Sequence, residues 1–457
     1  MIDSGSDGRR SVRSRIVAWA LWDCGVTGMN AIVATFVFSV YLTGTVGKGL
    51  SGETSAASWL GRALAASGVA IAVLAPVIGV WVEAPHRRQI VLTVLTGSAV
   101  VSTSAMSAIR ADPAYLWAGL ALLAVTAACG DLASVPYNAM LRQLSTPQTS
   151  GRISGFGWAA GYVGSVVLLL VIYTGFIAEV GATPGSPTGE VRGWLHVPTH
   201  DGLNIRAAML MAAAWFAMFG LPLLVVAPRL SGAGQESPAR LGALGGYRKL
   251  WTEISTEWRR DRNMVYFLVA SAIFRDGLAG VFAFGAVLGV NVYGISQADV
   301  LIFGVAASVV AALGAALGGL LDDRIGSKPL ILGSLTALIV VLLVLLMLSG
   351  AGVFWVCGLL LCLFIGPAQS SARAMLLRMV RQGKEGVAFG LYTMTGRAVS
   401  FVAPALFSIC VDVFHATRAG IAGLCVVLVA GLLAMLVVHP PQRSSIESSS
   451  YVVEPSG

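Results

Sequence analysis

Long apolar runs recur along the whole chain, and they restrict its fold more than any other feature of the sequence. An α-helix of about 20 apolar residues is long enough to cross the hydrocarbon core of a bilayer. Hydropathy and helix-breaking residues predict twelve such helices, over residues 16–43, 60–83, 89–109, 114–139, 155–178, 205–228, 263–290, 297–321, 329–349, 353–377, 387–414 and 418–438. Only 11% of the 457 residues are charged, whereas a soluble domain carries about 25%. The sequence therefore predicts an all-α membrane protein and excludes a soluble enzyme, a disordered chain and a nucleic-acid-binding protein.

The basic residues are distributed unevenly between the two sides of the predicted helices. Loops on the side of the N-terminus hold 21 of the 30 lysines and arginines, the opposite loops hold 6, and 3 lie within the helices. Because cytoplasmic loops carry the excess of Lys and Arg, we expect both termini in the cytoplasm. Arginine outnumbers lysine and Ala, Gly and Val are abundant, as in bacteria with GC-rich genomes, so we expect a multi-pass protein of a bacterial plasma membrane.

The predicted helices fall into two groups of six, joined by a charged segment. We expect a cytoplasmic tail, an N-terminal six-helix bundle, a cytoplasmic linker, a C-terminal six-helix bundle and a disordered cytoplasmic tail, over residues 1–15, 16–228, 229–262, 263–438 and 439–457. Tryptophans and many charges in the linker favour an amphipathic helix on the membrane surface. The alternative is that the linker only connects the two bundles.

The two halves repeat part of one another's sequence. At a spacing of 235 residues, the identical pairs are Ala139 with Ala374, Met140 with Met375, Leu141 with Leu376, Gly151 with Gly386, Gly155 with Gly390 and Ser165 with Ser400. Three consecutive identities and three more at the same spacing indicate a duplicated six-helix unit. In such bundles the substrate path runs between the halves, near the middle of the membrane.

One loop motif is specific enough to indicate a superfamily. Residues 319–328, GLLDDRIGSK, resemble the loop motif G-x-x-x-D-R-x-G-x-K of the major facilitator superfamily, and they lie between the eighth and ninth predicted helices. A degraded copy, GVWVEAPHRR at residues 79–88, lies between the second and third. The resemblance implies twelve transmembrane helices in two pseudo-symmetric six-helix bundles.

The same resemblance implies a latch between helix ends at this loop. The residues that the motif assigns to it are Glu83, Asp322, Asp323, Arg324 and Lys328. The alternative is that the basic residues among them only set the orientation in the membrane. In the first copy, Ala84 stands where the motif has an arginine, which weakens the assignment of Glu83.

Four further segments resemble one branch of this superfamily, the vacuole-effluxer-like proteins. The segments are AWALWD at residues 18–23, YNAML at 137–141, SGFGWAAGY at 154–162 and FGLYTMTGR at 389–397. The branch includes bacterial members and the fungal autophagy-related vacuolar amino-acid exporter, so the resemblance implies a transporter and suggests efflux. The chain departs from the branch after Asp23, where residues 24–27 read CGVT instead of an aromatic followed by Ala-Asn-Ser.

Ionisable residues occur well inside the predicted helices. They are Asp23, Asp131, Asp276, Arg275, Arg373 and Arg397. A charge near the bilayer centre costs about 2.5–3.5 kcal/mol on insertion scales, so such groups face a cavity or pair with one another. The sequence leaves open which acid pairs with which arginine. The alternative to a functional role is that buried ion pairs only fix the helix packing.

Helical spacing gives these residues polar neighbours. Asp23 shares a helix face with Asn30, Asp131 with Asn138, and Gln369 with Arg373. The resemblance implies that the first, fourth, seventh and tenth helices line the central path. The expected substrate-binding residues are therefore Asp23, Asn30, Asn138, Asp276, Gln369 and Arg373.

The same charges provide candidates for proton coupling and for gating. Proton coupling needs an acid that binds a proton when its basic partner leaves, and Asp23 is the first candidate and Asp131 the second. Arg397 is the expected structural or gating partner. From sequence alone, a proton site and a substrate-ammonium site are indistinguishable.

The expected function is secondary transport by alternating access, with proton-coupled efflux of a small polar metabolite such as an amino acid. The alternatives are a broad-specificity drug or toxin exporter and a transport-inactive membrane scaffold or receptor. The sequence has no G-x-x-x-x-G-K-[ST] loop, zinc-protease motif or nucleophile elbow, so we expect no enzymatic activity, catalytic site, metal or cofactor. Expected partners are a small-molecule substrate, protons and the lipid bilayer, without nucleic acid, and the chain is expected to act as a monomer.

Overall fold

Helices make up nearly all of the structure. The computed structural model describes residues 4–48, 56–178, 191–230, 262–295 and 297–439. Within these ranges, twelve helices are long and apolar enough to cross a membrane. The prediction of an all-α, twelve-helix membrane protein is thereby confirmed. The expected surface helix in residues 229–262 and the expected tail after residue 439 lie almost wholly outside the described residues.

The N-terminal bundle contains the first six membrane-length helices. Its elements are α1 (Ser4–Asn30), η1 (Ala31–Phe36), α2 (Phe38–Tyr41), η2 (Leu42–Val46), α3 (Ala56–Trp81), α4 (Pro85–Ala105), η3 (Met106–Ala108), η4 (Pro113–Tyr115), α5 (Leu116–Ala139), α6 (Leu141–Leu144), α7 (Ser150–Ile172), η5 (Tyr173–Ile177), β1 (Val191–Arg192), β2 (Val197–Pro198), η6 (His200–Gly202) and α8 (Leu203–Leu230). The strands β1 and β2 form a two-residue antiparallel pair in one loop.

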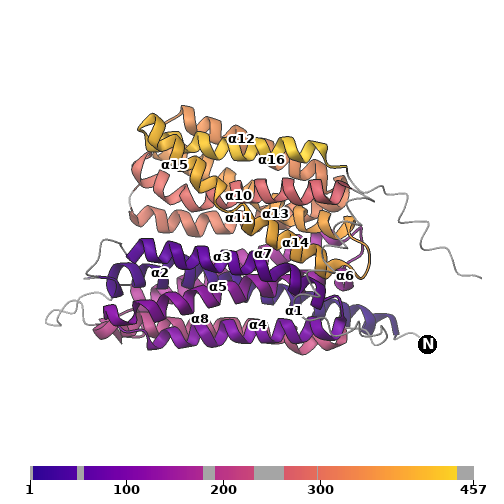
Figure 1. Ribbon diagram of the computed structural model, residues 1–457, viewed down its shortest axis with the longest axis horizontal. Coiled ribbons are helices and arrows are strands. Elements are labelled where there is room, and N and C mark those ends of the chain that lie inside the picture. The colour runs from indigo at the N-terminus through magenta and orange to yellow at the C-terminus, as the bar shows by residue number, and fades with distance from the viewer. Residues whose placement is uncertain (1–3, 49–55, 179–190, 231–261, 296, 440–457) are drawn as a thin grey trace, which may run out of the picture.

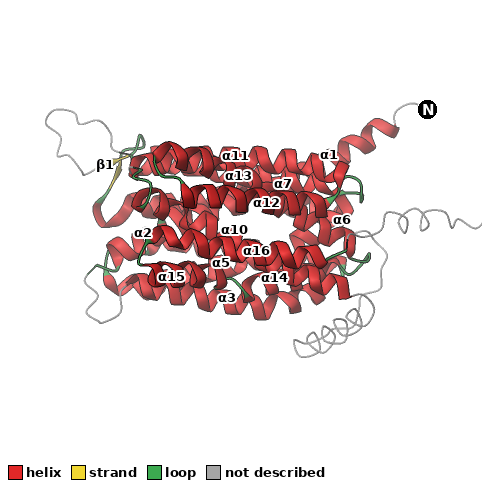
Figure 2. Ribbon diagram, turned by 90° about the horizontal axis from the view of Figure 1, so that it is seen from above, coloured by secondary structure: helices red, strands yellow, loops and turns green. Residues whose placement is uncertain are grey.

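The C-terminal bundle contains the other six. Its elements are α10 (Arg262–Asn291), α11 (Gln297–Ile325), α12 (Ser327–Met347), α13 (Ala351–Met379), α14 (Glu385–Ala398), α15 (Val402–Phe414), η7 (Thr417–Ala419) and α16 (Gly420–Val437). Figure 1 shows the two bundles as two stacked layers, with the N-terminal bundle below the C-terminal one. The loops gather at the two ends of the helices, as Figure 2 shows.

Two of the twelve helices are irregular, which the sequence did not predict. The C-terminal part of the first helix winds in π-turns over η1 and η2, with a bend at Val37 (φ −120°, ψ −66°) between them. The eleventh helix is interrupted between Ala398 and Val402, so that it consists of the two pieces α14 and α15. Interruptions of this kind free backbone groups inside the membrane region, which other groups must then satisfy.

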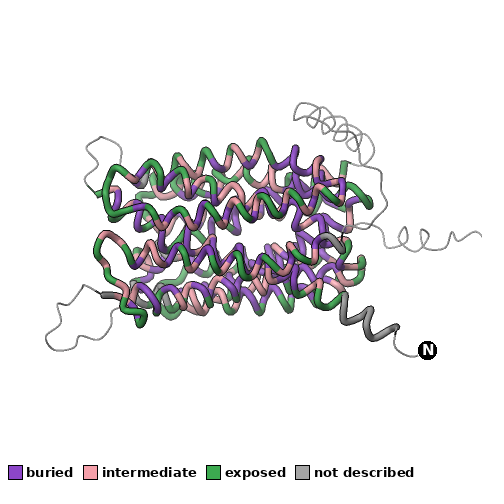
Figure 3. The backbone as a smooth tube through the Cα atoms, turned by 90° about the horizontal axis from the view of Figure 1, so that it is seen from below, coloured by how far each residue is buried: buried purple, intermediate pink, exposed green. Residues whose placement is uncertain are grey.

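The outer surface of the bundles is apolar. Large side chains such as Val101 and Met347 are 68% and 73% exposed on it, whereas buried residues concentrate between the helices, as Figure 3 shows. Exposed apolar side chains on helices of this length fit a surface covered by lipid. The described fold is therefore that of a multi-pass membrane protein.

The two bundles are in contact mainly through two pairs of helices, α7 with α11 and α3 with α14. These contacts are closest at the end of the bundles that carries residues 82–84, 140–149 and 380–384, which lies on the right in Figure 1. We call it the motif end, because Gly326 of the loop motif lies there, and we call the opposite end the far end.

Glycines allow the helices to cross closely at the motif end. A Cβ atom at Gly79 of α3 would lie 2.5 Å from the carbonyl oxygen of Gly386 in α14. A Cβ atom at Gly155 of α7 would lie 2.9 Å from the Cα atom of Gly319 in α11. Gly155 has its repeat partner in Gly390, which packs on Ala75 of α3. The sequence repeat therefore preserves glycines at two equivalent crossings between the bundles.

Candidate functional site

The guanidinium of Arg373, on α13 of the C-terminal bundle, reaches into the N-terminal bundle. Its Nε donates to Ser154 Oγ at 2.9 Å, and its Nη2 donates to the Ser154 carbonyl oxygen at 2.6 Å. Its Nη1 lies 3.4 Å from Asp23 Oδ2 and 3.3 Å from Asn138 Oδ1. Only 6% of the Arg373 side chain and 15% of the Asp23 side chain are exposed. Three predicted substrate-binding residues, Asp23, Asn138 and Arg373, therefore meet in one cluster.

Three aromatic rings surround this guanidinium. Arg373 Cζ lies 4.9 Å from the ring centroid of Trp19, 5.7 Å from that of Trp158 and 5.9 Å from that of Tyr137. All three distances lie within the range of cation–π attraction. We call the surroundings of this guanidinium the Arg373 pocket, which consists of Trp19, Asp23, Tyr137, Asn138, Ser154 and Trp158.

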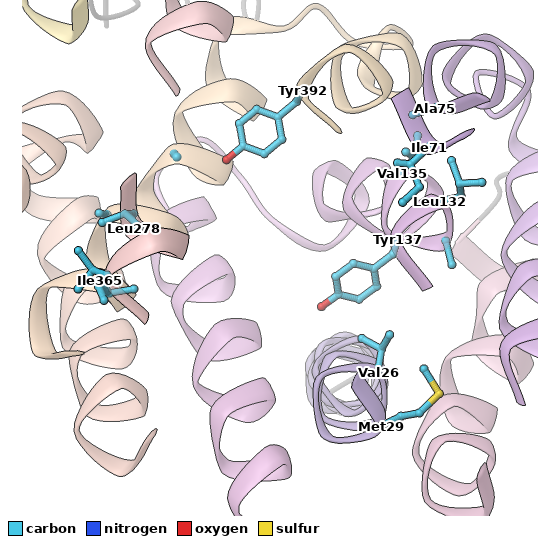
Figure 4. Close-up of a cluster of buried hydrophobic side chains, with 14 of the residues drawn as sticks. Val26, Met29, Ile71, Ala75, Leu132, Val135, Tyr137, Leu278, Ile365 and Tyr392 are labelled. Carbon is cyan, nitrogen blue, oxygen red and sulfur yellow. The ribbon is translucent and has the colours of Figure 1, made fainter. Parts of the chain in front are cut away.

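The aromatic part of the pocket is held in place by the N-terminal bundle itself. The rings of Trp19 and Tyr137 stack at 4.5 Å with an interplanar angle of 3°, and Trp22 stacks on Tyr137 at 4.3 Å. The indole N–H of Trp19 donates to the Tyr137 carbonyl oxygen, and that of Trp22 donates to Thr96 Oγ1, each at 3.1 Å. In Figure 4, Tyr137 lies close to Val26 of α1, in the buried core of this bundle.

A second ion pair joins the bundles nearer to the middle of the helices. Arg397 of α14 pairs with Asp131 of α5. The two side chains of this pair are more exposed than those of Arg373 and Asp23, at 39% for Arg397 and 27% for Asp131. The structure thus brings together the second proton-coupling candidate and the predicted gating arginine.

Asp276 lies apart from both pairs, at the break in the eleventh helix. Its Oδ2 accepts a hydrogen bond of 2.6 Å from the backbone N–H of Ala403, in the first turn of α15. The residue is 6% exposed. A carboxylate at a helix N-terminus satisfies a free N–H group and interacts favourably with the helix dipole. The geometry around this residue is that of a helix cap made by another helix.

Arg275, the neighbour of Asp276, contacts the other piece of the broken helix. Its guanidinium lies 3.8 Å from the ring centroid of Tyr392 in α14, and its Nη1 donates to the Tyr392 carbonyl oxygen at 3.2 Å. The adjacent residues Arg275 and Asp276 of α10 therefore bind one to each side of the break.

At the motif end, Asp323 connects α11 to the start of α7 in the other bundle. Its Oδ1 accepts from the backbone N–H of Gly151 at 2.8 Å, and its Oδ2 accepts from that of Arg152 at 3.1 Å. Arg378 Nη2 donates to Asp323 Oδ1 at 3.0 Å. The neighbouring Asp322 pairs with Arg378 and accepts from Ser327 Oγ. The carboxylate of Asp323 is placed as the anion that a helix N-terminus favours.

The degraded copy of the motif makes a related contact with the start of α14. Lys384 Nζ lies 3.2 Å from Glu83 Oε1. Next to it, Arg142 Nε lies 2.7 Å from Glu385 Oε1, and Arg142 also donates to the carbonyl oxygens of Leu377 and Val380. The motif end is therefore closed by polar contacts at both helix pairs.

Besides Asp276, four of the predicted residues take no part in these contacts between the bundles. Lys328 donates to the Leu436 carbonyl oxygen at 2.9 Å within its own bundle, and Arg324 is exposed. Asn30 and Gln369 are partly buried on the helices that carry Asp23 and Arg373, but they lie outside the Arg373 pocket.

Sequence reasoning missed several residues of the site. These are Ser154, Trp158, Arg378, Arg142 and Glu385. Ser154 and Trp158 belong to the segment SGFGWAAGY, whose only sequence signal is its resemblance to the vacuole-effluxer-like branch. Arg378, Arg142 and Glu385 lie at helix ends, where the cost of a charge is small and its position therefore carries little information. Among the described residues, no three His, Cys, Asp or Glu side chains form a group that could hold a metal ion.

Comparisons with known proteins agree on one family. Residues 45–447 match the model of the family "Vacuole effluxer Atg22 like". The chain is 21% identical over 434 residues, 94% of its length, to the "Uncharacterized MFS-type transporter YxiO" of Bacillus subtilis, 96% of which is covered. It is 23% identical over 323 residues to Autophagy-related protein 22 of Cryptococcus neoformans, a match that covers 65% of this chain and 55% of the fungal protein.

Solved structures agree on the fold. The proton:xylose symporter XylE of the major facilitator superfamily matches with a TM-score of 0.68 and 15% sequence identity, over 94% of this chain and 97% of that one. The superfamily transporter FucP matches with a TM-score of 0.67 and 10% identity, over 94% and 99%. At these identities the likeness establishes the arrangement of the helices.

Proposed function

The chain belongs to the family of vacuole effluxers like Atg22, in the major facilitator superfamily, and we propose that it exports a small polar metabolite by proton-coupled alternating access. Amino acids are the first candidates, because the branch that the sequence resembles includes a fungal vacuolar amino-acid exporter, and this chain matches the family model and Autophagy-related protein 22. The distribution of Lys and Arg supports a bacterial plasma membrane location with both termini, and hence the motif end, in the cytoplasm. The proposed working unit is a monomer.

The observation that carries this proposal is the pairing of membrane-embedded charges across the two bundles. Arg373 reaches Asp23, and Arg397 reaches Asp131, each from the opposite bundle. In alternating access the two bundles rock around a site between them. Opening the motif end would separate both pairs, so their charges would need new partners in that state.

Asp131 is the proposed proton-coupling residue. Its partner Arg397 belongs to the other bundle, and both side chains are only partly buried. A carboxylate that loses its arginine partner in a poorly solvated place binds a proton more readily, because the charged form is no longer stabilised. Protonation of Asp131 would then accompany the opening of the motif end.

The test uses purified full-length protein in liposomes. Metabolites that accumulate in the medium of overexpressing cells, relative to cells lacking the gene, are supplied as substrates. With a pH gradient, the wild type is expected to accumulate a substrate against its gradient. The variant Asp131→Asn is expected to accumulate about tenfold less substrate than the wild type. It should still exchange labelled for unlabelled substrate, since exchange needs no net proton movement.

The matched control is Asp412→Asn, which neutralises an exposed acid on α15. It is expected to transport like the wild type. Undiminished accumulation by Asp131→Asn would overturn the assignment of the proton. If the wild type moved none of the metabolites that the cells release, the export proposal itself would be rejected.

A further inference from the structure

We infer that the Arg373 pocket is the binding site for a cationic group of the substrate, and that Arg373 and the substrate occupy it in turn. This inference rests on the proposed transport function and names its substrate class, which is metabolites with a primary ammonium or a guanidinium group. In the described state the guanidinium of Arg373 stands in the place of that group.

The chemistry of the pocket is that of a cation site. Toward the guanidinium it presents the Asp23 carboxylate, the Asn138 side-chain oxygen and both oxygens of Ser154, at 2.6–3.4 Å. The remaining walls are the faces of three aromatic rings. Oxygen acceptors, one negative charge and aromatic faces bind ammonium and guanidinium groups, and the only charged wall group, the Asp23 carboxylate, would repel an anion.

The pocket and its present occupant belong to different bundles. All six pocket residues lie on α1, α5 and α7, and the stack of Trp19, Tyr137 and Trp22 is fixed by hydrogen bonds within the same bundle. Arg373 is carried by α13. When the bundles separate at the motif end, Arg373 would leave with its own bundle, while the walls would stay assembled.

Asp23 would then need another cation. Removing one partner of a buried ion pair leaves an uncompensated charge, which is strongly unfavourable. A substrate cation that enters from the motif end would supply the missing charge. When the motif end closes, the return of Arg373 to the pocket would displace the substrate toward the far end, which is the direction of export.

The size of the pocket is limited at Gly157 of α7. A Cβ atom there would lie 2.9 Å from Arg373 Nη2 and 2.6 Å from the ring of Trp19. The guanidinium therefore packs directly against Gly157, and a cationic head in the same place would have no room for an additional methyl group on this side. The geometry favours primary ammonium and guanidinium groups over bulky quaternary ones.

Binding of a small probe to the purified full-length protein tests this inference without any transport. In Arg373→Ala, calorimetric titration with ethylguanidinium chloride is expected to give at least tenfold tighter binding than in the wild type, because the probe replaces the missing guanidinium. Sodium chloride at equal concentration controls for ionic strength. The double variant Arg373→Ala with Asp23→Asn is expected to return to the weak binding of the wild type.

The matched control is Arg418→Ala, which removes an arginine that bonds Ser349, Leu345 and Leu348 within the C-terminal bundle and leaves the pocket filled. It is expected to bind the probe no better than the wild type. If Arg373→Ala does not fold, Arg373→Gln takes its place with the same expected order of affinities. Equal binding by the wild type and the Arg373 variant, or binding that survives the loss of Asp23, would overturn the inference. Because this measurement needs no substrate movement, its outcome is independent of whether export is detected.

Discussion

At the residue scale, helix-face spacing selected polar side chains inside the helices but did not show which of them meet. Asp23, Asn138 and Arg373 were predicted from polar positions on three separate helices, and they meet in the structure. Their pairing could not be predicted, because spacing describes one helix at a time and these contacts join two bundles. Asp276 was also predicted from its place inside a helix, but its partner is the backbone N–H of Ala403. A pattern of polar side chains cannot predict a backbone partner.

The close approach at Gly157 leads to a prediction for a single methyl group. In Gly157→Ala the new Cβ atom would overlap Trp19 and Arg373. Extra methyl groups in a packed interior cost about 1–3 kcal/mol, so the variant is expected to unfold at a lower temperature and to retain little transport. Thermal denaturation in detergent and liposome transport measure the two effects.

The control for this substitution is Gly68→Ala on α3, where no atom lies within 4 Å of an added Cβ. It is expected to match or exceed the wild-type unfolding temperature, because alanine is the better helix former. Wild-type stability and transport in Gly157→Ala would mean that the pocket is looser than the described distances imply.

At the element scale, the twelve helices were predictable and their irregularities were not. Each expected apolar run overlaps one membrane-length helix. A run of about 20 apolar residues favours a membrane-spanning helix regardless of the helix propensities of its single residues. The break in the eleventh helix had one sequence signal, Pro404, which lies in the first turn of α15, where proline is tolerated. Prolines 76, 136 and 367 lie inside continuous helices, so a proline alone does not distinguish the two outcomes.

The cap on α15 predicts how Asp276 variants should differ. Asp276→Ala would leave the buried N–H of Ala403 without its acceptor, which costs about 1–3 kcal/mol. Asp276→Asn keeps an oxygen acceptor, so it is expected to regain most of the lost stability. Thermal denaturation of the two variants beside the wild type checks this order.

Transport by the same variants separates the cap from a substrate-binding role. If Asp276 only caps α15, Asp276→Asn should transport at a rate near that of the wild type. Loss of transport in Asp276→Asn with an unchanged unfolding temperature would instead favour the substrate contact expected from the sequence.

At the scale of the whole molecule, the sequence predicted the two bundles and the latch loop but not which end of the bundles is closed. The motif identified Asp323, and the structure gives it backbone partners at Gly151 and Arg152. A motif identifies residues that are the same in every conformation of the protein. Which end is closed depends on the sum of many contacts between the bundles, and a local sequence pattern cannot predict that sum.

Removing the latch should shift the balance between open and closed motif ends. Asp323→Ala removes three hydrogen bonds to a carboxylate. A single bond to a charged group contributes about 1.5–3 kcal/mol, and a loss of about 2 kcal/mol changes a two-state ratio roughly 30-fold. Spin labels at the exposed residues 148 and 382, in a variant without the native cysteines, are expected to report longer distances between the bundles.

Lys328→Gln is the control for the latch, since Lys328 belongs to the same motif but bonds only within its own bundle among the described residues. Its label distances are expected to match those of the parent. Unchanged distances in Asp323→Ala would show that the glycine crossings and the polar contacts of Arg142 and Lys384 hold the motif end closed without this carboxylate.

The glycine crossings have a consequence for the rate at which the motif end opens. Where Gly79 meets Gly386, and Gly155 meets Gly319, main chain lies directly against main chain, so a change of side-chain rotamer cannot open the motif end. Whole helices must move apart, which is a collective motion on the microsecond-to-millisecond scale. Turnover should therefore respond to the lateral pressure and thickness of the surrounding lipids more strongly than in a carrier gated by swinging side chains.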